Sequence, residues 1–259
     1  MDYNLTKLKS IQIANWDGIV MGGGVGISIF SPFKIATEKT MFAMPEGKIG
    51  FFTDVGSCYF LSKMRNNIGY YLAMTSSRLK GEDVFNSGLS NYYIPQENIK
   101  KVYEELASNV PSSENTKEVI EKILASYHKG EENKKIANEE EIKEIFSGAS
   151  VKEIYLKAKE SKTEFGSSVV KNLEEFCPLS IHVIYRLIKT VENKSIKDCF
   201  VRDFEIAKYF SKSHDFREGV TSLLIQKGAV PKWTHKHLMD VSEEDVDEVF
   251  KESPNKLQI

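Results

Sequence analysis

The sequence predicts an α+β fold in which a few strands come first and helices fill the rest of the chain. Residues 1–60 are rich in glycine and apolar residues and poor in charge, and they contain short apolar segments of strand type. From residue 96 onward, apolar residues recur at helical spacing in segments that carry many charges. We therefore divide the chain into a strand-containing region, residues 1–95, and a helical region, residues 96–259.

The first region combines apolar, β-branched segments with one long segment of helical spacing. Residues 57–88 are expected to be helical, with a second helix starting within residues 76–88 and stopping at Gly88. The segments expected to form strands are residues 10–21, 34–45 and 89–95.

The second region reads as a series of amphipathic helices. In residues 131–161 charges of both signs alternate, which indicates a helix face in water. Residues 177–191 and 195–213 carry apolar stripes that favour core packing over a cofactor site, and the stripes in residues 178–210 also suit packing against a sister subunit. Ser242 precedes Asp245 by three residues, as in a capping box. The expected helices cover residues 96–110, 111–130, 131–148, 150–161, 177–191, 195–213 and 242–252, and one more is expected within residues 214–233.

Composition excludes several classes of protein. The 259 residues carry a net charge of −2, whereas a protein that mainly binds a nucleic acid backbone needs a basic surplus. Cys58, Cys177 and Cys199 are far apart, so neither a disulfide framework nor a metal site is indicated, and we expect buried free thiols in a reducing compartment. No apolar run approaches the length of a membrane span, and residues 1–10 show no secretory or transit pattern.

A run of glycines stands between two apolar segments. Residues 21–26 read MGGGVG, after a strand-like segment and before VGISIF, which can open a helix. A strand, a glycine turn and a helix start leave backbone N–H groups without an internal partner, which suits an anion or a developing oxyanion. The alternative is a tight structural turn. The run matches neither a dinucleotide-binding nor a Walker pattern, so nucleotide phosphate is disfavoured.

Two carboxylates follow the glycines in apolar surroundings. Glu46 lies in MPEGKIG and Asp54 in FFTDVGS. Desolvation raises the pKa of a carboxyl group and suits it to proton transfer near neutral pH, and two carboxylates in different surroundings can serve as base and acid. The alternative is two acidic loop residues in water. Of the histidines, His182 is expected to be packed in a helix, whereas His214, His235 and His237 are expected in polar surroundings, with HKH (residues 235–237) as a surface turn.

Together these segments resemble the crotonase (enoyl-CoA hydratase/isomerase) superfamily, and within it the 3-hydroxyisobutyryl-CoA hydrolase branch. The resemblance rests on DGIVMGGGVGIS, ATEKTMFAMPEGKIGFFTDVGSCYFLSK and GYYLAMTSSRLKGEDVFNSGL, and on the C-terminal HDFREGVTSLLIQKGAVPKW and VSEEDVDEVF. It implies a ββα spiral with a helical C-terminal region, an acyl-CoA thioester substrate, a place in valine breakdown and a mitochondrial location. No cofactor is implied, because the CoA belongs to the substrate.

The resemblance also implies roles for individual residues. Gly23 would give a backbone N–H to the thioester oxyanion, and Gly22 and Gly24 would permit the close approach. Glu46 would attack the thioester or activate water, and Asp54 would be its acid/base partner.

The sequence departs from the family pattern at its start, because the family's N-terminal third has no counterpart in it. That part holds the first strands, a second oxyanion N–H and much of the CoA-binding loop, so an incomplete crotonase core with an open sheet is expected within residues 1–95. One hypothesis is a hydrolase completed by a separate N-terminal polypeptide. Another is a structural role in the mitochondrial small ribosomal subunit, which contains a protein similar to this hydrolase, with ribosomal proteins covering the sheet. A third is that the sequence omits part of the natural chain.

Overall fold

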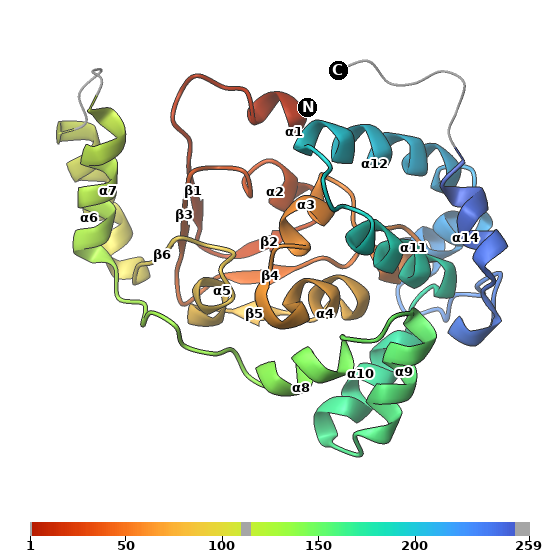
Figure 1. The fold of residues 1–259 in the computed structure, drawn as a ribbon. Helices are drawn as coiled ribbons and strands as arrows, with labels where there is room; N and C mark the ends of the chain where they lie inside the picture. Colours follow the sequence, from red (N-terminus) through yellow and green to blue (C-terminus); the bar gives the residue numbers. More distant parts are fainter. Residues whose placement is uncertain (1, 110–114, 252–259) are drawn as a thin grey trace. The chain divides into compact units, whose positions relative to one another are not determined.

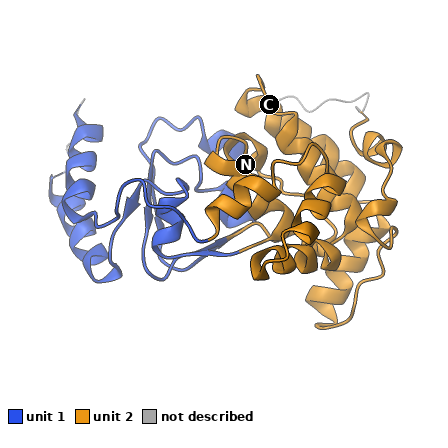
Figure 2. Ribbon diagram, turned by 60° about the horizontal axis from the view of Figure 1, so that its bottom comes forward, with its two compact units in different colours: residues 1–42, 78–137 blue, residues 43–77, 138–259 orange. Residues whose placement is uncertain are grey.

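The computed structural model describes residues 2–109 and 115–251 (Figure 1). They form two compact units (Figure 2). Unit 1 comprises residues 1–42 and 78–137, and unit 2 comprises residues 43–77 and 138–259. The strands found in the described residues all end by Tyr93, and helices follow. The predicted α+β class is therefore confirmed, while a domain boundary at residues 95/96 remains a proposal.

Unit 1 contains two small sheets (Figure 1). The first has the order β1-β3-β6 and is parallel, with Ile13 opposite Phe33 and Ile35 opposite Tyr92. The second has the order β2-β4-β5, in which β4 and β5 are antiparallel. The strands are β1 (Ile13–Trp16), β2 (Ile19–Met21), β3 (Phe33–Ala36), β4 (Met41–Ala43, whose last residue belongs to unit 2), β5 (Leu79–Lys80) and β6 (Tyr92–Tyr93).

Two of the predicted strands are each broken into two. The segment 10–21 divides at Asp17 and Gly18, where Gly18 has a φ of +146° that only glycine adopts readily. The segment 34–45 divides at a turn in which the Thr40 N–H donates to the Thr37 carbonyl oxygen at 3.1 Å. These local turns send the chain from one sheet to the other, so the prediction of single strands was wrong. The predicted strand over residues 89–95 is confirmed as β6.

Helices complete unit 1. A helical pair, α6 and α7, packs on the parallel sheet through one apolar cluster that includes Ile35, Ile94, Val102 and Leu124. The helices of this unit are α1 (Asp2–Leu5), α2 (Gly23–Gly26), α5 (Glu82–Asn86), α6 (Gln96–Asn109) and α7 (Thr116–Tyr127).

Unit 2 is helical, and Figure 1 shows α11 (Pro178–Lys189) among its other helices. Most residues of α11 are buried. The expectation that this segment is core is confirmed. Its short elements are η1 (Glu46–Ile49), α3 (Ser57–Leu61), η2 (Arg65–Asn67), α13 (His214–Gly219), the π-helical turn η3 (Val220–Ile225) and η4 (Leu238–Asp240). Its other helices are α4 (Ile68–Thr75), α8 (Glu139–Ile145), α9 (Val151–Glu160), α10 (Glu164–Glu175), α12 (Ile196–Phe210) and α14 (Glu243–Val249).

The long helix predicted over residues 57–88 is interrupted. Asn66 and Asn67 both adopt left-handed backbone angles between α3 and α4, and Ser76 does so at the end of α4. Such conformations end helices, and asparagine tolerates them better than most residues. The C-terminal stop at Gly88 is confirmed by its φ of +86°, and the capping box of Ser242 with Asp245 is present.

One acidic residue of the segment 131–161 is not in water. Glu139, at the start of α8, is 3% exposed, and its carboxylate accepts hydrogen bonds from Arg65 Nε at 2.7 Å and Nη2 at 2.9 Å. Asn66 Nδ2 donates to the same carboxylate at 2.7 Å. The prediction of a wholly solvated face is therefore wrong at this residue, because its partners lie more than 70 residues earlier in the chain.

Among the described residues, no helix is both long and apolar enough to cross a bilayer. Within the same residues, no group of three or more histidine, cysteine or acidic side chains is arranged to hold a metal ion.

Candidate active site

The glycine run forms the predicted strand–turn–helix in unit 1. β2 ends at Met21, Gly22 adopts φ +50° and ψ −123°, and α2 begins at Gly23. A Cβ placed on Gly23 or Gly24 would meet no atom within 4 Å, so this face of the turn is open in the described structure. The first N–H groups of a helix have no intrahelical acceptor. An oxyanion role for Gly23 remains a proposal that this geometry allows.

Glu46 lies in unit 2 at the first position of η1 and is 7% exposed. Neither of its carboxyl oxygens has a hydrogen-bond partner in another described residue. Burial raises the pKa of Glu46 to about 8, and the negative charge of Asp54 adds to the rise, against a lowering contribution from its own backbone amide. The prediction of a desolvated carboxyl group is confirmed for Glu46.

Asp54 is half-buried in the loop that leads into α3 of the same unit. The loop turns sharply after it, because Val55 and Gly56 both have positive φ angles, +55° and +71°. Asp54 is close enough to Glu46 for its charge to act on that group. The charge of Asp54 therefore acts on Glu46, and the two predicted carboxylates lie in surroundings that differ in exposure.

A third carboxylate, which sequence reasoning missed, holds the Asp54 loop. Asp203 on α12 is 5% exposed, and its Oδ2 accepts the Gly56 N–H at 2.7 Å. Burial raises the pKa of Asp203 well above its usual value, with further contributions from Cys58 and Asp54. The sequence did contain a signal for the burial of Asp203, because helical spacing puts this residue on the apolar stripe of Cys199, Ile206 and Phe210.

Aromatic packing fixes the segment between the two carboxylates. The Phe51 ring lies 4.8 Å from that of Phe216 and 5.6 Å from that of Phe210, measured between centroids. Phe52 is fully buried, with its ring centroid 5.5 Å from that of Phe210. Glu46 and Asp54 thus stand at the two ends of a segment that α12 and α13 hold in place.

The glycines and the carboxylates belong to different units. Gly22, Gly23 and Gly24 lie in unit 1, whereas Glu46 and Asp54 lie in unit 2. Their joint action therefore rests on the family resemblance and is a proposal.

The other candidate residues have structural roles. Nε2 of His182 lies 2.9 Å from the Leu238 carbonyl oxygen, and burial lowers the pKa of this histidine, as expected for a packed side chain. His214 is exposed, but His235 and His237 are half-buried and lie within hydrogen-bond distance of Asp245 and Tyr155, so the simple surface-turn interpretation is wrong for these two. The three cysteines are buried and free, as predicted.

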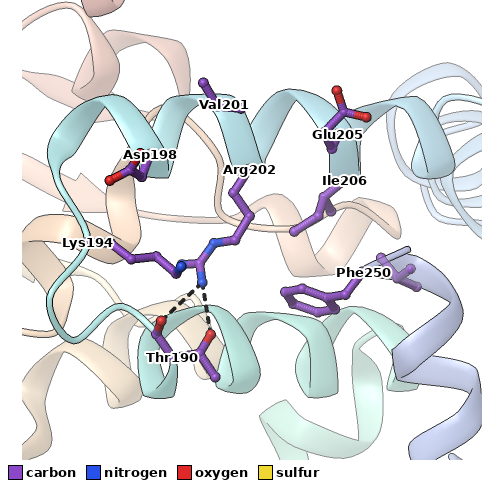
Figure 3. Close-up of a pocket in the computed structure, with 9 residues that line it drawn as sticks. Thr190, Lys194, Asp198, Val201, Arg202, Glu205, Ile206 and Phe250 are labelled. Carbon is purple, nitrogen blue, oxygen red and sulfur yellow. Dashed lines mark hydrogen bonds between the residues drawn. The ribbon is translucent and has the colours of Figure 1, made fainter. Parts of the chain in front are cut away.

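A cavity of about 560 Å³ lies elsewhere in unit 2 (Figure 3). Arg202 projects into it and donates to the carbonyl oxygen and the hydroxyl oxygen of Thr190. Neither Glu46 nor Asp54 lines it, so it is not the site of the two carboxylates. Its lining residues are Thr190, Lys194, Asp198, Val201, Arg202, Glu205, Ile206, Val249 and Phe250.

Comparison with solved structures supports the fold. A carnitinyl-CoA dehydratase from Mycobacterium thermoresistibile matches with a TM-score of 0.88 and 24% identity, over 99% of this chain and 72% of that one. An enoyl-CoA hydratase from Rhodobacter sphaeroides 2.4.1 matches with a TM-score of 0.84 and 21% identity, over 96% of this chain and 70% of that one. At these identities the likeness shows the fold alone, which is crotonase-like as expected.

Comparison with known sequences shows the family. The mitochondrial 3-hydroxyisobutyryl-CoA hydrolase of Mus musculus is 37% identical over 254 residues, which are 95% of this chain and 65% of that protein. The Homo sapiens protein of the same name is 36% identical over 241 residues, or 90% of this chain and 61% of that protein. The chain thus spans less than two thirds of the length of these relatives. The enoyl-CoA hydratase/isomerase family model matches residues 1–250, and the chain therefore belongs to that family.

Proposed function

We propose that this chain carries the carboxylate part of an acyl-CoA thioester hydrolase site whose substrate is 3-hydroxyisobutyryl-CoA. The observation that carries the proposal is the Glu46 carboxyl group, which is buried, has no hydrogen-bond partner in another described residue and has a pKa raised to about 8. Structural carboxyl groups in protein interiors are normally hydrogen-bonded, so an unpaired one beside a second carboxylate favours proton transfer or nucleophilic attack. The relatives' names supply the substrate and a mitochondrial location.

The reaction needs a nucleophile, a polarised carbonyl and a proton donor. The Glu46 carboxylate either attacks the acyl carbon, expelling the CoA thiolate and leaving an anhydride that water cleaves, or takes a proton from the water that attacks. Asp54, acting from its charged form, relays a proton of the attacking water to the departing sulfur. The Gly23 N–H donates to the oxyanion that forms on the thioester oxygen.

The first test is to isolate the chain from its own cells under native conditions, identify its companions by mass spectrometry and follow thiol release from 3-hydroxyisobutyryl-CoA. Single turnover in ¹⁸O-water then separates the two roles of Glu46, since ¹⁸O in the Glu46 carboxyl group requires the anhydride. Absence of thiol release from the native complex contradicts the proposal. Co-sedimentation with small-subunit ribosomal proteins and no turnover would support the structural role instead.

Replacing Gly23 with alanine is expected to leave the fold intact and lower kcat/KM by at least about tenfold. An added Cβ meets no atom of the described structure, and alanine favours a helix over glycine by up to about 1 kcal/mol, so stability does not fall. The methyl group would stand where the thioester oxygen approaches, and a small misplacement of reacting groups costs up to about a hundredfold in rate. Thiol release and thermal unfolding of Gly23→Ala check this; full activity would show that nothing approaches Gly23.

The pH dependence follows from Glu46. As base or nucleophile this group acts as a carboxylate, and its pKa is raised to about 8. We therefore expect kcat/KM to rise about tenfold per pH unit below pH 8 and to level off above it. Initial rates from pH 6 to 9.5, corrected for uncatalysed thioester hydrolysis, measure this profile. A flat profile over that range would exclude Glu46 as the group that must lose its proton.

A further inference from the structure

The turn that carries Glu46 is held by backbone contacts on both sides. The Met44 carbonyl oxygen, two residues before Glu46, accepts the Ser76 Oγ–H at 2.9 Å. The Gly47 carbonyl oxygen, one residue after it, accepts the Cys177 N–H at 3.3 Å. Cys177 is the N-cap of α11, so the central helix of unit 2 begins on this turn.

Helix α13 approaches the same turn closely. Gly50, which ends the turn with a φ of +68°, has no room for a side chain, because a Cβ there would lie 2.3 Å from the Asp215 carbonyl oxygen. The contact is matched from the other side, since a Cβ on Gly219 would lie 2.3 Å from backbone atoms of Ile49. These two glycines allow α13 to pack against the Glu46 turn at backbone distance.

One buried hydrogen bond ties these contacts together. The Cys177 Sγ–H donates to Asp215 Oδ2 at 3.3 Å, and both residues are buried. Asp215 Oδ1 accepts the N–H and the Oγ1–H of Thr234, each at 2.8 Å. Burial and the neighbouring Asp215 charge raise the pKa of the Cys177 thiol, so it keeps the proton that it donates.

We propose that Cys177 and Asp215 are positioning residues that hold the Glu46 carboxyl group in its dry, unpaired state. Cys177 touches the turn at Gly47 and Asp215 touches it at Gly50, so the bond between their side chains keeps both contacts in register. The expected effect of these two residues on turnover rests on the proposed function of Glu46. Their expected effect on the ionisation of Glu46 does not depend on that function, because this ionisation can be followed without substrate.

The test compares Cys177→Ala, which removes the donor, with Cys177→Ser, which keeps a hydroxyl donor. The readout is the ionisation midpoint of Glu46 in the full chain, from infrared carboxyl absorption between pH 4 and 10 with Glu46→Gln subtracted. With the bond lost, water reaches the turn, and the midpoint is expected to fall by about one pH unit in Cys177→Ala. Cys177→Ser is expected to restore it to the wild-type value. Turnover is compared at pH 9.5, where Glu46 is ionised in both proteins; there kcat should fall about tenfold in Cys177→Ala with KM nearly unchanged.

Two further variants keep the test decisive. Thr234→Val removes a donor to Asp215 from an exposed position and should lower the midpoint by a smaller amount, even if Cys177→Ala does not fold. Cys199→Ala is the matched control, a buried thiol that interacts with Cys58 and Arg202, and it should lower the melting temperature without moving the midpoint.

An unchanged midpoint in Cys177→Ala and Thr234→Val, or an equal shift in Cys177→Ser and Cys177→Ala, would overturn the proposal. If the midpoint moves as expected but the native protein releases no thiol, the positioning role stands and the proposed hydrolysis fails.

Discussion

Replacing Glu46 with glutamine is expected to raise the free energy of unfolding by about 3 kcal/mol at pH 7, and to lower thioester hydrolysis by about a thousandfold. The gain in stability arises because the carboxyl group is buried without a partner in another described residue, with its pKa raised from 4.5 to about 8. Glutamine has nearly the same shape and carries no charge at any pH.

The direction of this stability change follows from comparing the folded and the unfolded chain. In the unfolded chain Glu46 ionises near pH 4.5, and in the folded chain only near pH 8. The folded state thus holds a proton that the unfolded state releases, and the stability present below pH 4.5 is lost as the pH rises to 8. Glu46→Gln does not suffer this loss. The difference between the variant and the wild type should therefore shrink to about 1 kcal/mol at pH 5.

Denaturant unfolding of both proteins at pH 5, 7 and 8 measures the effect. A Glu46→Gln variant that is less stable than the wild type at pH 7 would mean that a favourable interaction of the carboxylate outweighs its burial. A more stable variant without turnover would show that this position is kept at the expense of stability, which is common for functional groups.

Glu46 could be singled out from the sequence because its apolar setting is local. Methionine, proline, glycine and isoleucine surround it within MPEGKIG, and such neighbours predict burial before any fold is known. The glycine run was readable for the same reason, since strand, turn and helix start are adjacent in the chain. The family resemblance added the roles and the fold.

Contacts between segments that are distant in the sequence could not be predicted from the local pattern of residues. Asp203 meets Gly56 across 147 residues, and Asp215 meets Cys177 across 38. Residues that look like an ordinary helix charge or a loop acid become buried once such segments pack. The prediction of single strands was wrong for a different reason. A turn of four residues such as Thr37–Thr40 hardly changes the apolar content of the segment around it, so the apolar pattern does not show where the strand ends.

Glu139→Gln is expected to lower the free energy of unfolding by about 3 kcal/mol, the opposite sign to Glu46→Gln. Both glutamates are buried in unit 2, at 3% and 7% exposure, but Glu139 accepts hydrogen bonds from Arg65 and Asn66. Glutamine cannot accept two bonds from a guanidinium with both terminal atoms, and it removes a negative charge from the first turn of α8.

The comparison isolates hydrogen bonding from burial, because the residue type, the substitution and the degree of exposure are closely matched. The Arg65 side chain is 40% exposed, so water can solvate it in the variant, which keeps the loss below that of a fully buried ion pair. Denaturant unfolding and thiol release of Glu139→Gln give the check: stability should fall while the Glu46 ionisation midpoint stays in place. If Glu139→Gln raises stability as Glu46→Gln does, burial alone decides the energetics of these carboxyl groups, and the unpaired state of Glu46 loses its significance as a mark of function.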